Sequence, residues 1–281
     1  MIQPWRHSSG CRPVYPECHT AMSTVPATKD NAESSDIIDS LGRGLRVIEA
    51  FDDAHPRLSS SEVAARSGIT RTAARRYLLS LVHFGYADTD GKRFWLMPRI
   101  LRLGQSYLDS ARLPRLVQPF LQRLSADCGE TFNFSVLDGH EVVYVARSAS
   151  NRMESIGFAV SARVPAHLVT PGIAMLSTFS QPALEAWAAV HEFNAFTQNS
   201  ATNAQQFLQT VAAARHQGYW TSEGLLTLGL RGIAMPVKDR KGECRGAIGS
   251  TMPAQPYTHD EMVQRFLPRL TEVANVLRDL V

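Results

Sequence analysis

The feature that most constrains this chain is a pair of short helical segments joined at a glycine. Ser59 and Glu62 have the spacing of a capping box, in which a hydroxyl and a carboxylate bond to free amides at a helix start. Gly68 supplies the tight turn after that segment, Thr70 can cap the helix that follows, and Gly85 ends it. This order of signals predicts a helix-turn-helix.

An earlier helix completes the unit. Ser40 can cap it, and its apolar side chains recur every three or four residues, as Leu41, Leu45, Ile48 and Phe51. Three helices of this kind can bury a shared core, so we expect an all-α unit at this end of the chain.

The second helix of the pair has two distinct faces. Ala74, Tyr77, Leu78 and Leu81 share an apolar face, which leaves the arginines pointing elsewhere. Residues 63–87 contain four arginines and no acid, and residues 40–112 hold twelve basic side chains against seven acidic ones. On a chain with a net charge of +3, this local excess favours a polyanion, and duplex DNA fits a rigid cationic helix. The predicted DNA contacts here are Arg66, Thr70, Arg71, Thr72, Arg75 and Arg76.

A short hairpin follows the helices. Residues 86–88 and 94–96 are β-prone, and Asp90-Gly91 between them is a turn signal. Lys92 and Arg93 stand at its tip, where a wing would meet the DNA beside the recognition helix. We therefore expect a winged helix-turn-helix with Lys92 and Arg93 as further DNA contacts. An ordinary helical bundle with a hairpin is the structural alternative.

Several motifs in this part of the chain have the order and spacing of a known family. LGRGLRVIEAF and SEVAARSGITRTAARRYLLSLVHFGYADTDGKRFWLMPRILRLGQSYLDSARL closely resemble the amino-terminal half of the IclR family of bacterial transcription regulators. RRYLLSL, the FGY before the wing and PRILRLGQSYL after it resemble the branch that governs catabolism of protocatechuate and para-hydroxybenzoate. The resemblance extends more weakly to the carboxy terminus, over about residues 38–281.

A chain of 281 residues is long enough for two domains, and the pattern places a connector between them. Pro98 can open a helix whose apolar stripe includes Ile100, Leu101, Gly104, Tyr107 and Leu108. We expect a disordered tail over 1–37, the winged helix-turn-helix over 38–97, a linker helix over 98–112, and an effector-binding and oligomerisation domain over 113–281. The resemblance implies that the linker helix packs against a second subunit, and two recognition helices suit a palindromic operator.

The periodicity changes from helical to alternating near residue 131. Residues 131–137 and 141–145 alternate around the turn Asp138-Gly139, which predicts a β-hairpin. Further strands are expected at 155–160, 232–237 and 246–251, and helices at about 172–179, 182–190, 204–217 and after the capping box of Thr258 and Glu261. This mixture predicts an α+β domain, an antiparallel sheet with flanking helices. The resemblance implies a GAF- or profilin-like sensor.

Signatures of catalysis are missing from the sequence. It has no GxSxG, HExxH, GxxxxGK[ST] or CxxC motif, so we expect no catalytic residue, metal or cofactor. His7, Cys11, Cys18 and His19 form a formal zinc set, but their Pro-, Ser- and Thr-rich surroundings favour a disordered tail, and a true start at Met22 would also explain the segment. Four cysteines, no secretory leader and no apolar run of about 20 residues predict a cytoplasmic protein without a membrane partner.

The second candidate site is a small-molecule pocket. Residues 161–172 join a strand to a helix, where free amides suit a carboxylate and Arg163, His167 and Thr170 add donors. The alternatives are a rim salt bridge or structural hydrogen bond for Arg163 and His167, and a helix cap for Thr170. The resemblance implies effector contacts at Pro171 and in two further strips, at Ser222, Glu223, Gly232, Gly249 and Thr251.

The sequence departs from the family pattern at three positions. Gly232 and Gly249 stand where many members carry cysteine or serine, and Ile173 stands where a basic residue is common. We expect these changes to enlarge the pocket and to remove polar contacts, which leaves the identity of the effector open.

Together these features predict a DNA-binding transcription regulator, a homodimer or homotetramer whose operator binding is modulated by a small organic acid, in particular a monocyclic aromatic carboxylate. Two alternatives belong to other classes. One is an enzyme on a small acid, with Cys244 or His167 catalytic and an appended DNA-binding domain; the other is a constitutive DNA-binding protein whose carboxy-terminal half only oligomerises. Repression or activation, the operator and the choice between dimer and tetramer stay open.

Overall fold

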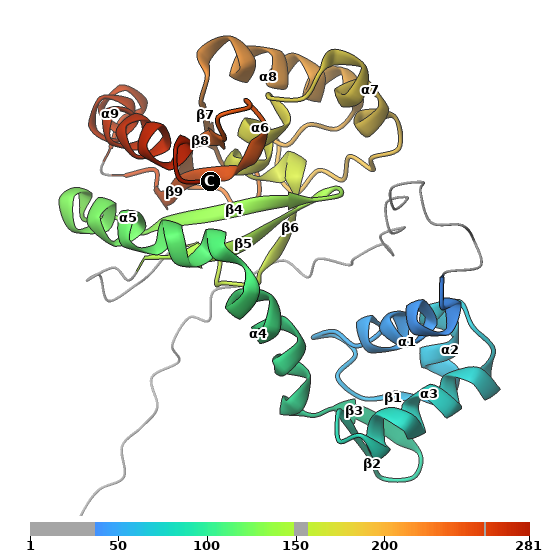
Figure 1. Cartoon of the computed structure of the whole chain (residues 1–281). Helices are drawn as coiled ribbons and strands as arrows, with labels where there is room; N and C mark the ends of the chain where they lie inside the picture. The colour runs from blue at the N-terminus through green and yellow to red at the C-terminus, as the bar shows by residue number, and fades with distance from the viewer. Residues whose placement is uncertain (1–36, 149–156, 256) are drawn as a thin grey trace, which may run out of the picture.

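The computed structural model describes residues 37–148, 157–255 and 257–281, and arranges them as two units joined by a helix (Figure 1). The predicted tail lies outside these ranges apart from Ile37. The formal zinc set of His7, Cys11, Cys18 and His19 lies outside them as well.

The amino-terminal unit is built from α1 (Asp39–Glu49), α2 (Ser60–Ser67) and α3 (Arg71–His83). The predicted capping box of α2 is confirmed, since the Ser59 hydroxyl accepts from the Glu62 amide and the Glu62 carboxylate accepts from the Ser59 amide. Gly68 ends α2 with a φ of 66°, a left-handed conformation that glycine adopts without strain. The three helices bury a core that includes Val47, Val63, Ala74, Leu78 and Phe94.

Helix α1 differs from the prediction at its start. Ser40 lies inside the helix rather than capping it, and Ile38 is the cap residue without a side-chain bond. Phe51 packs against the core of this unit, but Leu41 and Leu45, the first two residues of the predicted stripe, are 63% and 46% exposed. The periodicity correctly indicated an amphipathic helix, but the start of its apolar stripe stays largely exposed in the described structure.

The wing has one more strand than the sequence pattern indicated. β1 (Leu58–Ser59), β2 (Ala87–Thr89) and β3 (Arg93–Leu96) form an antiparallel sheet in the order β1-β3-β2. The turn between β2 and β3 is held by Asp90, whose carboxylate accepts from the amides of Lys92 and Arg93. β1 was missed because two residues are too few to show an alternating pattern.

The connector consists of a 3₁₀ turn, η2 (Pro98–Ile100), followed by α4 (Leu101–Ser110). Pro98 stands at the first position of the turn, as predicted, because it has no amide proton to satisfy. No residue of α4 is buried, and Leu101, Leu103 and Tyr107 are among its exposed apolar side chains. Ala111 alone separates α4 from α5 (Arg112–Cys128).

A six-stranded antiparallel sheet forms the centre of the carboxy-terminal unit. Its order is β6-β5-β4-β9-β8-β7, so the hairpins β4–β5 and β8–β9 meet at its middle through β4 and β9. The strands are β4 (Phe132–Asp138), β5 (Glu141–Arg147), β6 (Arg163–Pro165), β7 (Trp220–Glu223), β8 (Leu230–Lys238) and β9 (Cys244–Pro253). β6 and β7 are short edge strands that the sequence pattern did not reveal.

Helices cover both faces of this sheet (Figure 1). One face packs on α5 and on α9 (His259–Arg278), around Phe132, Phe134, Phe266 and Leu270. The other face packs on the remaining helices through a second apolar core. Those helices are η3 (Ala166–Leu168), α6 (Thr170–Leu176), α7 (Gln181–Ala189) and α8 (Ala204–Gln217). The two-domain fold class is therefore confirmed.

Two local predictions were tested with different outcomes. The strand predicted at 155–160 is wrong in its described part, because residue 157 lies in a bend, 158 and 159 have no regular structure, and 160 begins a turn. The capping box of α9 is confirmed, since Thr258 accepts from the amide of Glu261 and the Glu261 carboxylate accepts from the amide of Thr258.

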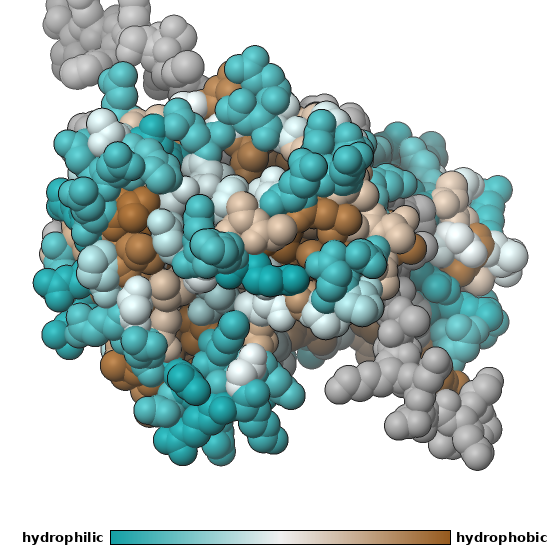
Figure 2. Space-filling view, turned by 90° about the horizontal axis from the view of Figure 1, so that it is seen from above, coloured by the Kyte–Doolittle hydropathy of each residue, from teal (hydrophilic) through white to brown (hydrophobic). Residues whose placement is uncertain are grey.

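The surface in Figure 2 is mainly hydrophilic, and apolar residues show through in separate patches. Among the described helices, none combines the length and the apolar character that a bilayer-crossing segment needs. Most large apolar side chains of the carboxy-terminal unit are used in the two cores on either side of the sheet.

Candidate functional site

The outward face of α3 is the first candidate site. The start of this helix is fixed by Thr70, whose Oγ1 accepts a hydrogen bond from the amide of Ala73 at 3.3 Å. Ala74 and Leu78 are fully buried in the core shared with α1 and α2. The opposite face is exposed and carries Arg71, Thr72, Arg75 and Arg76.

Three arginines on this face have no acidic partner in the part of the chain that the structure describes. No described carboxylate lies within 4 Å of the guanidinium of Arg71, Arg75 or Arg76. Their charge is therefore available to an external anion, and the width of an α-helix matches the major groove of B-DNA.

Arg66 differs from the prediction. Its Nε donates to the carbonyl oxygen of Ala50 at 2.7 Å, and its guanidinium pairs with the carboxylate of Asp52 and lies 3.2 Å from Nδ1 of His55. These bonds tie α2 to the segment that follows α1. Arg66 thus has a structural role, and helix periodicity did not show this because all three partners lie at least 11 residues away.

We expect Arg66→Ala to destabilise the amino-terminal unit by about 1–2 kcal/mol, because charge-assisted bonds at a partly exposed site are lost. Arg76→Ala removes the same charge from the free face and should change stability by less than about 0.5 kcal/mol. Chemical denaturation of both variants, followed by circular dichroism, measures the difference. Equal stabilities would show that the Arg66 bonds contribute nothing.

The wing adds a cation that sequence reasoning missed. The guanidinium of Arg57 lies 4.2 Å from the ring centre of Trp95, and its carbonyl oxygen accepts from Arg93 at 3.4 Å. Arg57, Lys92 and Arg93 are all exposed. Pairing of β1 with β3 brings Arg57 to the wing, and no local sequence signal indicated that pairing.

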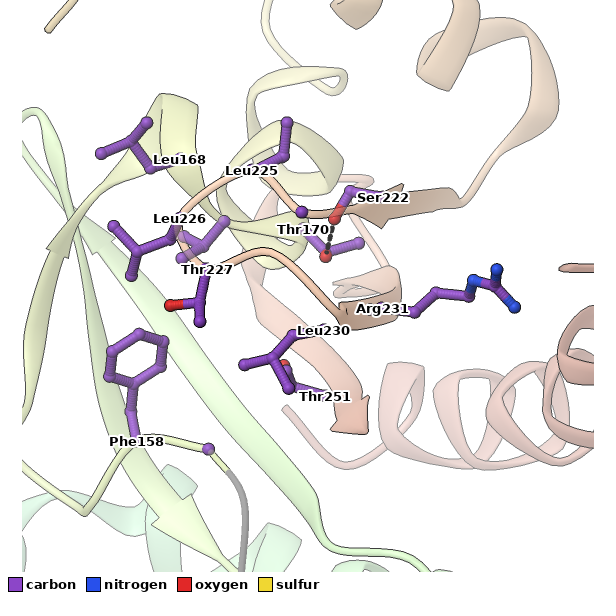
Figure 3. A pocket seen from close by; sticks show the side chains of 14 residues that line it. Phe158, Leu168, Thr170, Ser222, Leu225, Leu226, Thr227, Leu230, Arg231 and Thr251 are labelled. Atoms are coloured by element: carbon purple, nitrogen blue, oxygen red, sulfur yellow. Dashed lines mark hydrogen bonds between the residues drawn. The ribbon is translucent and has the colours of Figure 1, made fainter. Parts of the chain in front are cut away.

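The second candidate site is a pocket on the α6 side of the large sheet. It is open to solvent and comprises about 560 Å³ of empty space, including its mouth. Figure 3 shows the loop between β7 and β8 folded over it, with Leu225 and Leu226 on that loop. The lining residues are Gly157, Phe158, Leu168, Val169, Thr170, Ser222, Gly224, Leu225, Leu226, Thr227, Leu230, Arg231, Gly232 and Thr251.

Four of the nine predicted effector contacts line this pocket: Thr170, Ser222, Gly232 and Thr251. Thr170 and Ser222 come from α6 and β7, and their hydroxyl oxygens are 2.5 Å apart (Figure 3). Either hydroxyl can donate to the other, so the pair keeps one free O–H for a ligand. Thr170 is not the helix cap, because Val169 occupies that position.

Gly232 does not enlarge the pocket as we expected. A Cβ at this position would lie 2.1 Å from Thr170 Oγ1, so the Thr170 hydroxyl already fills the space that a side chain would occupy. Gly249 is also different, since a Cβ there would meet the carbonyl oxygen of Ile233 at 2.5 Å. Both glycines therefore allow close packing of neighbouring groups.

The other predicted contacts lie outside the lining. Arg163, on β6, is paired with Asp138 at 2.6 Å and with Glu141 at 2.7 Å, which matches the salt-bridge alternative. Glu223 is 2.6 Å from Arg231, whose side chain points away from the pocket in Figure 3. Pro171, Ile173 and Gly249 are not among the lining residues either.

His167 belongs to a partly buried cluster of imidazoles. His191 Nε2 lies 2.7 Å from His167 Nδ1, and His191 Nδ1 lies 3.0 Å from His140 Nδ1. The His191 ring stacks on Trp187, with 4.3 Å between ring centres. Burial, followed by the neighbouring imidazoles, lowers the pKa of His191 to about 3, and burial also lowers the pKa of His140 and His167. His167 is therefore a structural residue.

This cluster predicts a pH dependence of stability. The pKa of His191 in the folded protein is about 3, below its usual value of 6.5, so between these two pH values the unfolded chain binds more protons than the folded one. The contribution of His191 to stability is therefore fully present above about pH 6.5 and is lost as the pH falls toward 3. We expect the wild-type melting temperature to fall between about pH 7 and pH 5, and to fall less in His191→Phe. His216→Gln, at an exposed position of α8, should keep the wild-type difference, and a wild-type slope in His191→Phe would contradict the prediction.

Cys244 does not suit the catalytic role that the enzyme alternative requires. Burial raises the pKa of its thiol, and its Sγ donates to the carbonyl oxygen of Gly246 at 3.4 Å. A nucleophilic cysteine needs the opposite shift, toward the thiolate. Within the described residues, no three metal-ligating side chains gather in a group that could hold a metal ion.

Sequence reasoning missed most of the apolar wall, which comes from the loop 224–230 and from Phe158 and Leu168. The loop has no periodicity that would assign it to a core. Its one local signal is a pair of glycines, Gly224 and Gly229, with φ of 64° and 78°.

Comparison with known proteins matches two parts of the chain to two domains of one family. The IclR helix-turn-helix domain matches residues 40–91, and the bacterial transcriptional regulator IclR C-terminal domain matches residues 105–278. The p-hydroxybenzoate hydroxylase transcriptional activator of Acinetobacter baylyi is 37% identical over 270 residues, which cover 94% of this chain and all of that protein.

Solved structures show the same architecture. An IclR family regulator from Brucella abortus matches with a TM-score of 0.75 at 19% identity, covering 88% of this chain and 94% of that one. The inducer-binding domain of the PobR transcription factor from Acinetobacter, a double mutant in complex with 3-hydroxybenzoic acid, matches with a TM-score of 0.58 at 33% identity. The match covers 61% of this chain and all of the PobR domain. On this evidence the chain belongs to the IclR family of bacterial transcription regulators and is most similar to its hydroxybenzoate and protocatechuate branch.

Proposed function

We propose that this regulator reads its operator with α3 and the wing. The observation that carries the proposal is the exposed row of Arg71, Arg75 and Arg76, which no described acid neutralises. Thr70 and Thr72 flank this row at the helix start and add hydroxyl contacts. Lys92, Arg93 and Arg57 would hold the DNA backbone beside it, because flexible cations at a wing neutralise phosphates.

The acting species is a homo-oligomer in this proposal. Apolar side chains are exposed on α1 and α4, among them Leu41, Leu45, Leu101, Leu103 and Tyr107. A second subunit that covers these helices would bury them and place two copies of α3 on one face of the DNA. A palindromic operator follows from that symmetry. This organisation gives residues 38–97 the role of reader, 98–112 that of linker and 113–281 that of effector-binding and oligomerisation domain.

The effector in this proposal is a monocyclic aromatic carboxylate held in the pocket beneath the loop 224–230. Phe158, Leu168, Leu226 and Leu230 supply apolar walls for a ring, and the hydroxyls of Thr170, Ser222, Thr227 and Thr251 supply donors for oxygen atoms. The related inducer-binding domain from Acinetobacter was crystallised with 3-hydroxybenzoic acid. A more distant IclR homologue from Microbacterium hydrocarbonoxydans was crystallised with 4-hydroxybenzoate.

Binding in the pocket would control DNA affinity through α4, which joins the two units. A ligand shifts such an equilibrium only by its differential affinity for the two arrangements, so a coupling of about 1–3 kcal/mol is expected. The same α4 helix would carry the subunit contact, so a change in its placement would alter the spacing of the two readers.

A gel-shift series tests the proposal at a fixed salt concentration. Full-length protein is titrated onto its operator with no acid, with benzoate and hydroxybenzoates, and with short aliphatic acids. A change of about 5- to 150-fold in DNA affinity with the aromatic acids alone supports it. Unchanged affinity with every acid would remove the effector role and favour the constitutive DNA-binding alternative.

A further inference from the structure

A buried carboxamide lies on the pocket side of the large sheet and takes no part in the contacts described so far. Side chains alternate along β4, so Phe132 and Phe134 enter the core under α5 and α9 while Asn133 faces the side of α6. Asn133 is 5% exposed. It stands opposite Gly249 in the register with β9.

The side chain of Asn133 has no partner for its carbonyl oxygen. Among the described residues no donor reaches Asn133 Oδ1, although this atom is fully buried. Leaving a buried acceptor unpaired costs about 1–3 kcal/mol, so native proteins rarely retain one without a use for it. The position of Asn133 therefore requires an explanation beyond packing.

Asn133 is not itself one of the lining residues, but it lies directly behind Gly157, which is one of them. Its Nδ2 is 3.7 Å from the point where a Cβ on Gly157 would lie, and Gly157 is one of the lining residues. On the other side, the register partner Gly249 has no side chain to cover the amide. Thr251, two residues further along β9 and on the same face, also lines the pocket.

We propose that Asn133 is a specificity-determining residue of the effector pocket, and that it recognises a ring hydroxyl of the ligand. This inference rests on the effector role proposed above. A hydroxyl can donate to the free Oδ1 and also accept from Nδ2, whereas a carboxylate can only accept and leaves Oδ1 unpaired. Exchange of the amide oxygen and nitrogen by a flip leaves this match unchanged. The class of ligand is thus a hydroxylated aromatic acid in preference to its unsubstituted parent.

Isothermal titration of the full-length protein with 3-hydroxybenzoate, 4-hydroxybenzoate and benzoate tests this role. In the wild type, at least one hydroxybenzoate should bind about 10-fold or more tightly than benzoate, because benzoate leaves the amide unpaired. Asn133→Leu has a side chain of similar size without polar atoms, so we expect the ratio of the two dissociation constants to fall toward one. Asn133→Val is the second variant, with a shape that suits a strand.

Two measurements separate recognition from a structural role. Ser135→Ala is the matched control, because Ser135 is buried on the same face of β4 but stands opposite Ala247 rather than Gly249, and it should keep the wild-type ratio. The melting temperature of unliganded Asn133→Leu should not fall, since the variant removes an unpaired polar group. A structural residue would instead lower that temperature and weaken all three acids equally.

The outcomes also distinguish this inference from the proposed function. If the wild type binds none of the three acids, the effector class itself is wrong. If the wild type binds them and both Asn133 variants keep its preference for the hydroxylated acid, the effector role stands and the role of Asn133 is overturned.

Discussion

Replacing Arg75 and Arg76 together by alanine is expected to lower the affinity for the operator by about 100-fold or more. Each arginine that reads a base contributes about 1–3 kcal/mol of discrimination, and each that holds a phosphate contributes a salt-dependent term. Both side chains are exposed on α3, and neither has an acidic partner in the described structure, so nothing inside the molecule compensates for their loss. Their removal should leave the fold intact, because Ala74 and Leu78 hold the helix in place.

The salt dependence of binding shows what these arginines contact. Loss of two phosphate contacts reduces the slope of log K against log salt by about 2, whereas loss of two base contacts leaves the slope unchanged and relaxes sequence preference. Arg123→Ala combined with Arg278→Ala removes the same charge from α5 and α9 and should bind the operator almost as the wild type does. If the variant without Arg75 and Arg76 binds the operator as tightly as the wild type, another element must recognise the DNA.

Gly232→Ala is expected to weaken effector binding by about 10-fold or more while DNA binding without effector persists. The new Cβ would lie 2.1 Å from Thr170 Oγ1, so the hydroxyl must move and its 2.5 Å bond to Ser222 is lost. Both residues line the pocket, and loss of a charge-assisted bond from one of these hydroxyls to the effector carboxylate costs about 1.5–3 kcal/mol. The crowded site should also destabilise the unliganded protein by about 1–3 kcal/mol.

A second substitution separates crowding from recognition. Thr170→Ala combined with Gly232→Ala removes the clashing hydroxyl, so the melting temperature should recover while effector affinity stays low. Calorimetric titration and thermal denaturation of the two variants measure both effects. Effector binding by Gly232→Ala that equals the wild type would mean that the Thr170–Ser222 pair does not contact the ligand.

The two candidate sites were predictable from sequence to different degrees. The outward residues of α3 follow from helix periodicity. When the apolar residues of a helix face the core, the residues on its opposite face must point to solvent. Arg66 obeys the same pattern but bonds to Ala50 and Asp52, partners that come close only through the packing of α2 on the end of α1. The composition includes the charge of Arg66 in the basic excess, but it does not show that this charge is paired within the domain.

The pocket was less accessible to sequence reasoning. Thr170 was found through its place at a helix start, and Ser222, Gly232 and Thr251 through family motifs, while Leu225 and Leu226 come from a loop without periodicity. Arg163 and His167 have the chemistry of acid ligands, yet their side chains are committed to Asp138, Glu141 and His191. Side-chain chemistry indicates what a residue can bind, but its neighbours determine whether it is free to do so.

By itself, the sequence determined the local elements of this protein: the helix pair with its capping box, the cationic face of α3, the β4–β5 hairpin and the family to which they belong. These depend on side-chain periodicity and on bonds between residues a few positions apart. Only the tertiary structure decided which polar groups are satisfied internally and which are left unpaired. Arg66 and His167 have internal partners and Asn133 Oδ1 has none among the described residues, because pairing depends on segments that folding brings together from distant parts of the chain.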